Sequence, residues 1–211
     1  MRTLSPLPLI ALLLVAGACD RGREPAPDPK TDPYKGLELL QAMGKPDFTL
    51  TGLDGKEFKF RQETDGYVTL LFFGYTHCPD VCPLHMANIG SVLRQAPPEV
   101  TNRVKVIFVT TDPERDTPEV LRTFLDRFSP QIIGLTGTPE QISAAEQAMR
   151  LLPAYKDTTN KLADGGYSVG HAAQVIAFTA DDSLRVVYPF GIRQEDWAYD
   201  IPRLVRVGAP R

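Results

Sequence analysis

The chain has 211 residues, of which 43% are hydrophobic and 23% are charged. That composition is enough for one domain with a full-sized core, and the length does not require two. The formal net charge of -3 provides no basic field to grip a phosphate backbone, which argues against nucleic acid as a partner.

Residues 1–18 have the features of an export signal. Arg2 provides a positive start, residues 7–18 are almost wholly apolar, and three small residues precede Cys19. This arrangement resembles the lipobox of bacterial lipoproteins, whose cysteine is lipidated and becomes the new N-terminus, although Ala16 stands where a lipobox usually has Leu. We therefore predict a lipoprotein-type signal peptide over 1–18 and lipidation of Cys19.

Two alternatives remain open for this segment. One is an uncleaved membrane anchor, but the apolar stretch is interrupted by Pro6 and Pro8 and is shorter than the roughly 20 residues that span a bilayer. The other is a simple secretory signal. All three interpretations place the domain outside the cytoplasm, on the periplasmic side of a membrane.

Residues 19–35 are predicted to form a tether. The segment is polar and rich in proline, so it cannot build a core and tends toward an extended, semi-stiff chain. It would hold the folded domain, predicted to comprise residues 36–211, away from the membrane.

The folded domain is predicted to open with a β-hairpin and two buried strands. Apolar residues alternate with polar ones over 48–50 and 58–60, on either side of the turn sequence Asp54-Gly55. Residues 67–75 and 104–110 are continuous apolar runs, which are typical of central strands buried on both faces.

Helices and strands alternate in the second half of the chain. Residues 117–128 carry apolar side chains at helical spacing behind a proline in the first turn, which predicts a helix. A short strand is expected over 132–135. Thr138 and Gln141 form the capping box of another helix, which is predicted to run to about Leu152.

The C-terminal part is predicted to form a closing hairpin, with strands over 173–178 and 184–188, and a helical segment with a break near Pro202. Strands that alternate with helices, bracketed by hairpins, indicate an α/β sandwich with a central mixed sheet, flanking helices and an N-terminal β-hairpin. This order of elements is thioredoxin-like.

Cys78 and Cys82 lie directly after the first buried strand, at the predicted opening of a helix that continues to about Arg94. Residues four apart on a helical turn face the same side, and their Cα separation of roughly 6 Å suits a disulfide. The two sulfurs can also converge on one metal ion, and a helix N-terminus favours the thiolate that binds metals or attacks disulfides. A purely structural disulfide is the alternative, but a bridge over so few residues constrains the unfolded chain very little.

A third ligand must come from the histidines. Two thiolates favour Cu(I) or zinc, and one imidazole would complete a low-coordinate copper site. His77 is expected to point away from its neighbour Cys78, His85 lies one turn beyond Cys82, and His171 lies in a predicted glycine-rich loop before the closing hairpin. Judged from residue type and spacing alone, a local zinc cluster of His77, Cys78, Cys82 and His85 is an open alternative.

Residues 74–83, GYTHCPDVCP, resemble the signature of the Sco/SenC family, the copper proteins of cytochrome oxidase assembly. The resemblance continues through 111–118 and 167–178, and it covers nearly everything from about Asp47 to the C-terminus. It implies a thioredoxin-like fold and the binding of Cu(I) or Cu(II) by two cysteines and one histidine. Carried over by position, these ligands are Cys78, Cys82 and His171.

Two acidic residues, Asp112 and Asp116, fall in the second of these motifs. They are candidates for shaping the site or a partner surface. A role in capping a helix or structuring a loop is equally open.

The resemblance further implies a metallochaperone that matures the CuA centre of cytochrome oxidase subunit II, with another copper chaperone as a further candidate partner. The same dithiol could instead act as a reductase that keeps the subunit II cysteines reduced. A general thioredoxin-like or peroxiredoxin-like exchanger is the third interpretation, but three residues between the cysteines depart from the Cys-x-x-Cys spacing of exchangers. The first interpretation favours a protein that is not an enzyme.

Overall fold

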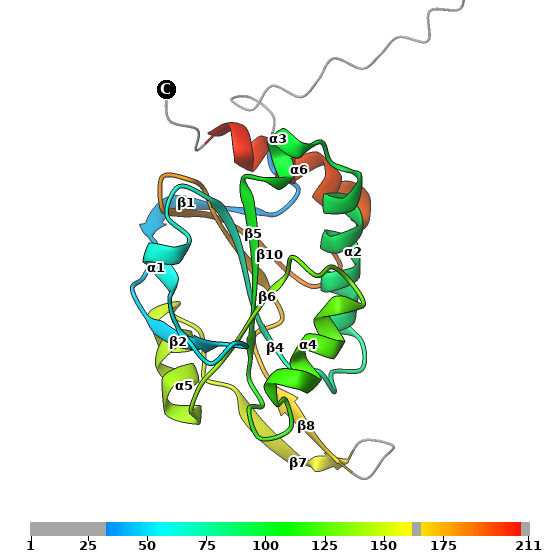
Figure 1. Ribbon diagram of the computed structural model, residues 1–211. Helices are drawn as coiled ribbons and strands as arrows, with labels where there is room; N and C mark the ends of the chain where they lie inside the picture. The colour runs from blue at the N-terminus through cyan, green and yellow to red at the C-terminus, as the bar shows by residue number, and fades with distance from the viewer. Residues whose placement is uncertain (1–32, 162–165, 208–211) are drawn as a thin grey trace, which may run out of the picture.

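One eight-stranded sheet organises the chain, in the order β1-β10-β9-β4-β5-β6-β2-β3 (Figure 1). The computed structural model describes residues 33–161 and 166–207. The strands of the sheet are β1 (Leu37–Gly44), β2 (Thr49–Gly52), β3 (Glu57–Lys59), β4 (Val68–Gly74), β5 (Val104–Thr110), β6 (Ile133–Thr136), β9 (Val175–Phe178) and β10 (Ser183–Tyr188). The neighbours β4, β5 and β6 run parallel and the other pairs are antiparallel, which confirms the predicted mixed sheet.

The central strand β4 is buried on both faces, as its apolar run predicted. Val68, Leu70 and Phe72 belong to the core on one side of the sheet, whereas Leu71 and Phe73 belong to the core on the other side. Successive side chains of a strand point to opposite faces, so a run that is apolar except for the buried Thr69 buries both faces. Each of these side chains contributes about 1.5–3 kcal/mol when fully removed from water.

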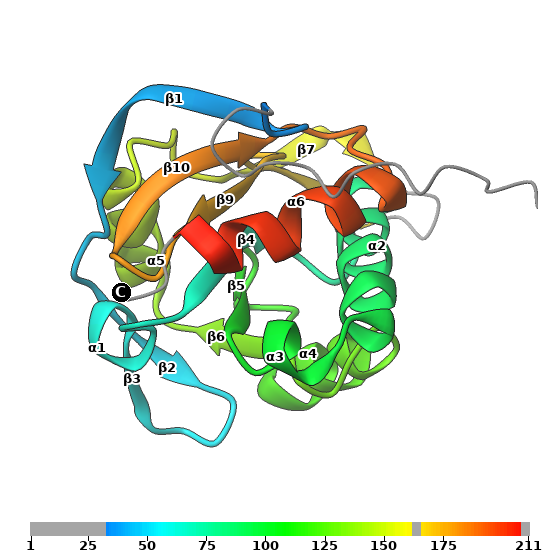
Figure 2. The ribbon, with the colours of Figure 1, turned by 90° about the horizontal axis from the view of Figure 1, so that it is seen from above.

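Helices cover both faces of the sheet (Figure 2). One face carries α2 (Val81–Gln95), α3 (Pro98–Thr101), α4 (Pro118–Asp126) and α6 (Gln194–Val207), and the other carries α1 (Phe60–Glu63) and α5 (Pro139–Ala148). The side chain of Thr117 caps α4, and Thr138 with Gln141 forms the predicted capping box of α5. The thioredoxin-like α/β sandwich predicted from the order of elements is therefore confirmed.

Two pieces of β-structure were not predicted. Strand β1 precedes the predicted hairpin of β2 and β3, pairs with β10 at the edge of the sheet and is largely exposed, so its sequence has no core-facing alternation. Strands β7 (Tyr155–Lys161) and β8 (Tyr167–Gly170) form a separate two-stranded sheet. The glycine-rich loop predicted before His171 is therefore in part a strand.

Two predicted helix features were wrong. Helix α5 ends at Ala148 rather than near Leu152, because Arg150 adopts a positive φ of 57°, which an α-helix excludes. Helix α6 continues through Pro202 without a break. Its inner face buries three large side chains completely, and this packing outweighs the lost backbone hydrogen bond. They are Trp197, Ile201 and Leu204.

The predictions for the N-terminal segment lie outside the described residues. They are the signal peptide over 1–18, the lipidation of Cys19 and most of the tether over 19–35. Within 33–161 and 166–207, no helix combines the length and the apolarity needed to cross a membrane.

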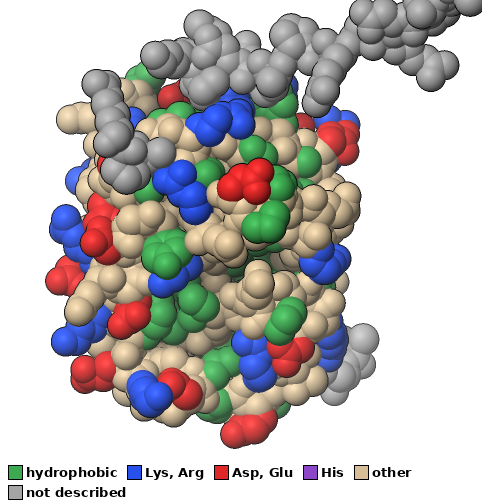
Figure 3. Space-filling view, turned by 45° about the horizontal axis from the view of Figure 1, so that its top comes forward, with side chains coloured by type: hydrophobic (Ala, Val, Ile, Leu, Met, Phe, Trp, Pro, Cys, Tyr) green, Lys and Arg blue, Asp and Glu red, His purple; other side chains and the backbone are tan. Residues whose placement is uncertain are grey.

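Charged side chains of both signs are spread over the surface. On the face shown in Figure 3, Lys and Arg side chains are interspersed with Asp and Glu side chains. Together with the net charge of -3, this arrangement gives that face no extended field of one sign.

Candidate metal centre

The two cysteines lie where the central strand passes into helix α2. The turn after β4 carries Cys78, and Asp80 caps the helix by accepting a hydrogen bond from the Val81 N–H at 2.7 Å. Cys82 is the second residue of α2 and Cys78 precedes the helix, so only one of the two lies on the helix itself. The Cys82 N–H, one of the unpaired donors of the first turn, donates to the Cys78 sulfur at 3.4 Å.

The Cys82 sulfur rests against the end of β4. A Cβ atom at Gly74 would lie 2.7 Å from this sulfur and 2.6 Å from the ring of Phe72, closer than real contacts allow. Only glycine lets the first turn of α2 approach the strand this closely. Cys82 is fully buried as a result, whereas Cys78 is 8% exposed.

His171 follows directly after β8 and reaches both sulfurs. Its Nε2 atom lies 3.6 Å from the Cys82 sulfur and 4.0 Å from the Cys78 sulfur. The Nδ1 atom lies 3.0 Å from the Ala172 carbonyl oxygen, which can only accept, so Nδ1 carries the proton and the lone pair of the neutral ring is on Nε2. The three ligand atoms all lie within 4.8 Å of one another.

Two aromatic rings hold the imidazole of His171 in this orientation. The ring centroids of Phe72 and Tyr75 lie 5.8 and 5.6 Å from its own, both in edge-on geometry. Both rings belong to β4 or to the turn that follows it. The strand that leads to the cysteines therefore also orients the histidine.

The two thiols are electrostatically unequal. A hydrogen bond from the Cys82 thiol is the largest influence on Cys78, and with the Cys82 N–H it lowers the pKa of Cys78 to about 4. Burial, together with this same hydrogen bond, raises the pKa of Cys82 well above its ordinary value. The metal-free site therefore holds one thiolate and one thiol at neutral pH.

The other two histidines have different partners. His85 is buried and donates from Nε2 to the Ala173 carbonyl at 3.0 Å, and burial lowers its pKa. The Nδ1 atom of His77 lies 3.8 Å from an Asp116 oxygen, and its side chain is 38% exposed. In the part of the chain that the structure describes, the group able to hold a metal is Cys78, Cys82 and His171, so the local zinc cluster is not assembled.

Asp112 and Asp116 are both buried and structure the loop after β5. Asp116 accepts hydrogen bonds from the N–H and the hydroxyl of Thr76, at 3.0 and 2.6 Å. Asp112 accepts from the Tyr167 hydroxyl at 2.8 Å and also binds Arg115. Neither caps a helix, since Thr117 caps α4. Tyr167 was not predicted as a site residue, although the alternation of polar and apolar residues in β8 was a signal for it.

The fold and the site define a class: a thioredoxin-like α/β protein with a Cys-Cys-His group that could hold a metal ion. The sequence model of the SCO1/SenC family matches residues 38–206. The chain therefore belongs to the SCO1/SenC family.

Individual relatives agree with this assignment. The mitochondrial SCO2 homolog of Bos taurus is 34% identical over 141 residues, which cover 66% of this chain and 52% of that protein. Copper-bound ScoI of Bradyrhizobium japonicum is 32% identical with a TM-score of 0.63, covering 77% of this chain and 100% of the other. For copper-bound yeast Sco1 the identity is 27% and the TM-score 0.67, over 81% and 92% of the two chains. The chain spans about half to two thirds of the length of the curated relatives it matches.

Alkylation of the reduced, metal-free chain should follow the unequal pKa values. Iodoacetamide should modify Cys78 before Cys82, at a rate that is nearly constant above about pH 6 and falls as the pH approaches about 4, because the reactive thiolate is lost there. Cys82→Ala should move this midpoint upward, since it removes the thiol donor, and Cys82→Ser should move it less. A midpoint near the ordinary thiol value of 9 in the unmodified chain would contradict the assignment.

Proposed function

We propose that this chain is an extracytoplasmic copper-binding metallochaperone that helps to assemble the CuA centre of cytochrome c oxidase subunit II. The observation that carries the proposal is the convergence of Cys78, Cys82 and His171, in a family with copper-bound members of known structure. Two thiolates and one imidazole suit Cu(I) and leave room for an incoming ligand.

The burial of the three ligands supports an order of transfer. His171 is partly exposed, Cys78 is nearly buried and Cys82 is fully buried. An acceptor protein therefore replaces His171 first and Cys82 last, so that copper is never without ligands during stepwise exchange. Loading requires Cys82 to lose its proton, and copper binding is therefore linked to proton release.

A second function is favoured by the unequal thiols. The Cys78 thiolate can attack a disulfide of subunit II, and Cys82 can then displace the second product thiol and give up its proton to it. The chain ends with a Cys78–Cys82 disulfide and the target with one thiol and one thiolate, and the thiolate takes its proton from water. A general exchanger would use the same pair and leave His171 without a role.

The ligand set can be tested by metal binding to the reduced chain. It should bind a single copper ion, and Cys78→Ser or Cys82→Ser should largely abolish binding. His171→Ala should lower the Cu(I) affinity by about tenfold or more, measured by competition with a chromophoric chelator. The matched control is His77→Ala, which should leave the affinity unchanged. Full copper retention in either cysteine variant, or a larger loss for His85→Ala than for His171→Ala, would reject this ligand set.

Loss of the protein should leave cytochrome oxidase deficient in CuA, with haem insertion less affected, because the site matches the cysteine and histidine ligands of CuA. The measurement is the CuA absorbance and copper content of purified oxidase from a deletion strain. Rescue of the CuA content by added copper supports copper delivery. Rescue by a reductant, together with complementation by the His171→Ala variant, supports the reductase function, which needs only the cysteines. Normal CuA content under copper limitation argues against both functions.

We also propose that residues 1–18 are removed, that Cys19 is lipidated and that residues 19–35 tether the domain of residues 36–211 to the periplasmic side of a membrane. Mass spectrometry of the native protein should find a lipidated Cys19 at the N-terminus. Cys19→Ser should release or mislocalise the domain. An intact Met1 on the mature membrane protein would favour an uncleaved anchor instead.

A further inference from the structure

His171 is carried by a hairpin that is not part of the main sheet. Within the described residues, strands β7 and β8 pair only with each other, and the hairpin projects from the body of the domain near α5 (Figure 1). The hydrogen bonds of the large sheet therefore do not fix the strand that ends next to His171. Its position relative to the cysteines depends on contacts between the hairpin and the loops beneath it.

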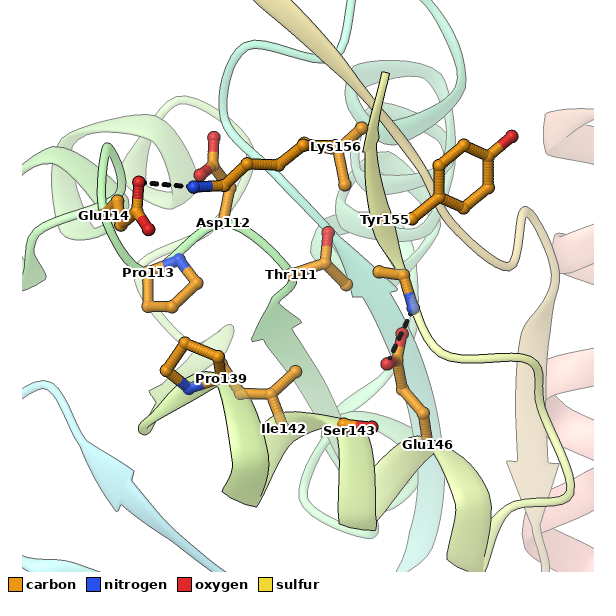
Figure 4. Close-up of a pocket in the computed structure, with 12 residues that line it drawn as sticks. Thr111, Asp112, Pro113, Glu114, Pro139, Ile142, Ser143, Glu146, Tyr155 and Lys156 are labelled. Atoms are coloured by element: carbon orange, nitrogen blue, oxygen red, sulfur yellow. Dashed lines mark hydrogen bonds and ion pairs between the residues drawn. The ribbon is translucent and has the colours of Figure 1, made fainter. Parts of the chain in front are cut away.

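A cavity of about 110 Å³ lies between β7, α5 and the loop after β5 (Figure 4). Around it the hairpin region meets the body through polar contacts. Lys156 and Glu114 form an ion pair of 2.5 Å, and the Ala154 N–H donates to Glu146 at 2.9 Å. The ion pair is about half exposed, and such pairs stabilise little. Besides the packing of Val169 in the core, these polar contacts help to hold the hairpin in place.

The strongest of these contacts is the one made by Tyr167 in β8. Its hydroxyl donates to an Asp112 carboxylate oxygen at 2.8 Å, and Asp112 is only 1% exposed. The guanidinium of Arg115 binds the same carboxylate and lies 3.7 Å from the centroid of the Tyr167 ring. A partly buried hydrogen bond to a charged acceptor, reinforced by a cation over the ring, is stronger than an exposed ion pair.

This contact continues as a chain of hydrogen bonds to the cysteine-bearing turn. The Asp112 N–H donates to the Thr110 hydroxyl at 3.0 Å, which donates to Asp116 at 2.7 Å. Asp116 in turn accepts from both the N–H and the hydroxyl of Thr76. Thr76 lies two residues before Cys78, and Tyr167 lies four residues before the histidine. These hydrogen bonds thus connect the strand that precedes His171 to the turn that carries Cys78.

We propose that Tyr167, acting through Asp112, is a positioning residue that sets the distance between the His171 imidazole and the two sulfurs, and through it the affinity for copper. The inference rests on the proposed function, because it takes His171 as a ligand. Groups that orient a ligand without touching the metal change metal affinity by roughly 10–100-fold in other metal sites.

The test is Tyr167→Phe in the full reduced chain, which removes the hydroxyl and keeps the ring over which Arg115 lies. Cu(I) affinity, measured with a competing chelator, should fall about tenfold. The thiolate-to-copper absorption and the electron paramagnetic resonance of the Cu(II) form should shift toward those of His171→Ala. In a His171→Ala background the same substitution should have no further effect, because the ligand it positions is already absent.

Tyr155→Phe is the matched control, since it removes a hydroxyl from the opposite strand of the same hairpin, and it should leave affinity and spectra unchanged. Thermal unfolding of each variant separates positioning from loss of fold. If Tyr167→Phe does not fold, Asp112→Asn replaces it in the test, because this variant keeps an oxygen acceptor but loses the charge. It should lower the Cu(I) affinity when His171 is present and have no further effect in the His171→Ala background.

Three results would overturn the inference in distinguishable ways. Wild-type affinity in Tyr167→Phe, with weakened binding in His171→Ala, rejects the positioning role alone. An equal loss in both backgrounds shows that Tyr167 acts on the cysteines or on general stability, and also rejects it. Unchanged affinity in His171→Ala rejects the proposed ligand set and this inference together.

Discussion

The site depends on the hydrogen bonds that stabilise the negatively charged Cys78 thiolate at the start of α2. The Cys78 thiolate is nearly buried, and it is stable there because the thiol and the N–H of Cys82 both point at it. Those donors are correctly placed only if the first turn of α2 lies against the end of β4, which Gly74 permits. The chemistry of the sulfurs therefore rests on the packing of one helix on one strand.

The topology of the sheet explains why three distant segments meet at that point. Strands β4 and β5 are parallel neighbours with Gly74 paired to Thr110. The cysteine turn and the loop containing Asp112 therefore both begin at the carboxyl ends of these strands. Loops at the carboxyl ends of adjacent parallel strands commonly build sites in α/β proteins. His171 comes to these strand ends from outside the large sheet. It lies between the end of β8 and the start of β9, which pairs with β4.

Features set by local sequence were predictable, and features set by tertiary contacts were not. The apolar run of β4, the caps of α4 and α5 and the position of the cysteine pair all follow from neighbouring residues. Strand β1 lies at an exposed edge, and β7 has a polar sequence without alternation, so neither shows a hydrophobic period. No local rule distinguished His171 from His85. Spacing alone left both open, and only the family resemblance selected His171.

The arrangement of buried polar groups bears on which function the site serves. A dithiol that only exchanges disulfides needs Cys78, Cys82 and the start of α2, and its reaction does not require a histidine 3.6 Å from the buried sulfur. Here two buried carboxylates, Asp112 and Asp116, join the histidine hairpin to the cysteine turn. Buried carboxylates are costly unless fully bonded, and the hydrogen bonds that satisfy these two fix the hairpin and the turn in one geometry. Copper held by all three ligands requires that geometry and disulfide exchange does not, which is why we propose metal delivery ahead of disulfide exchange.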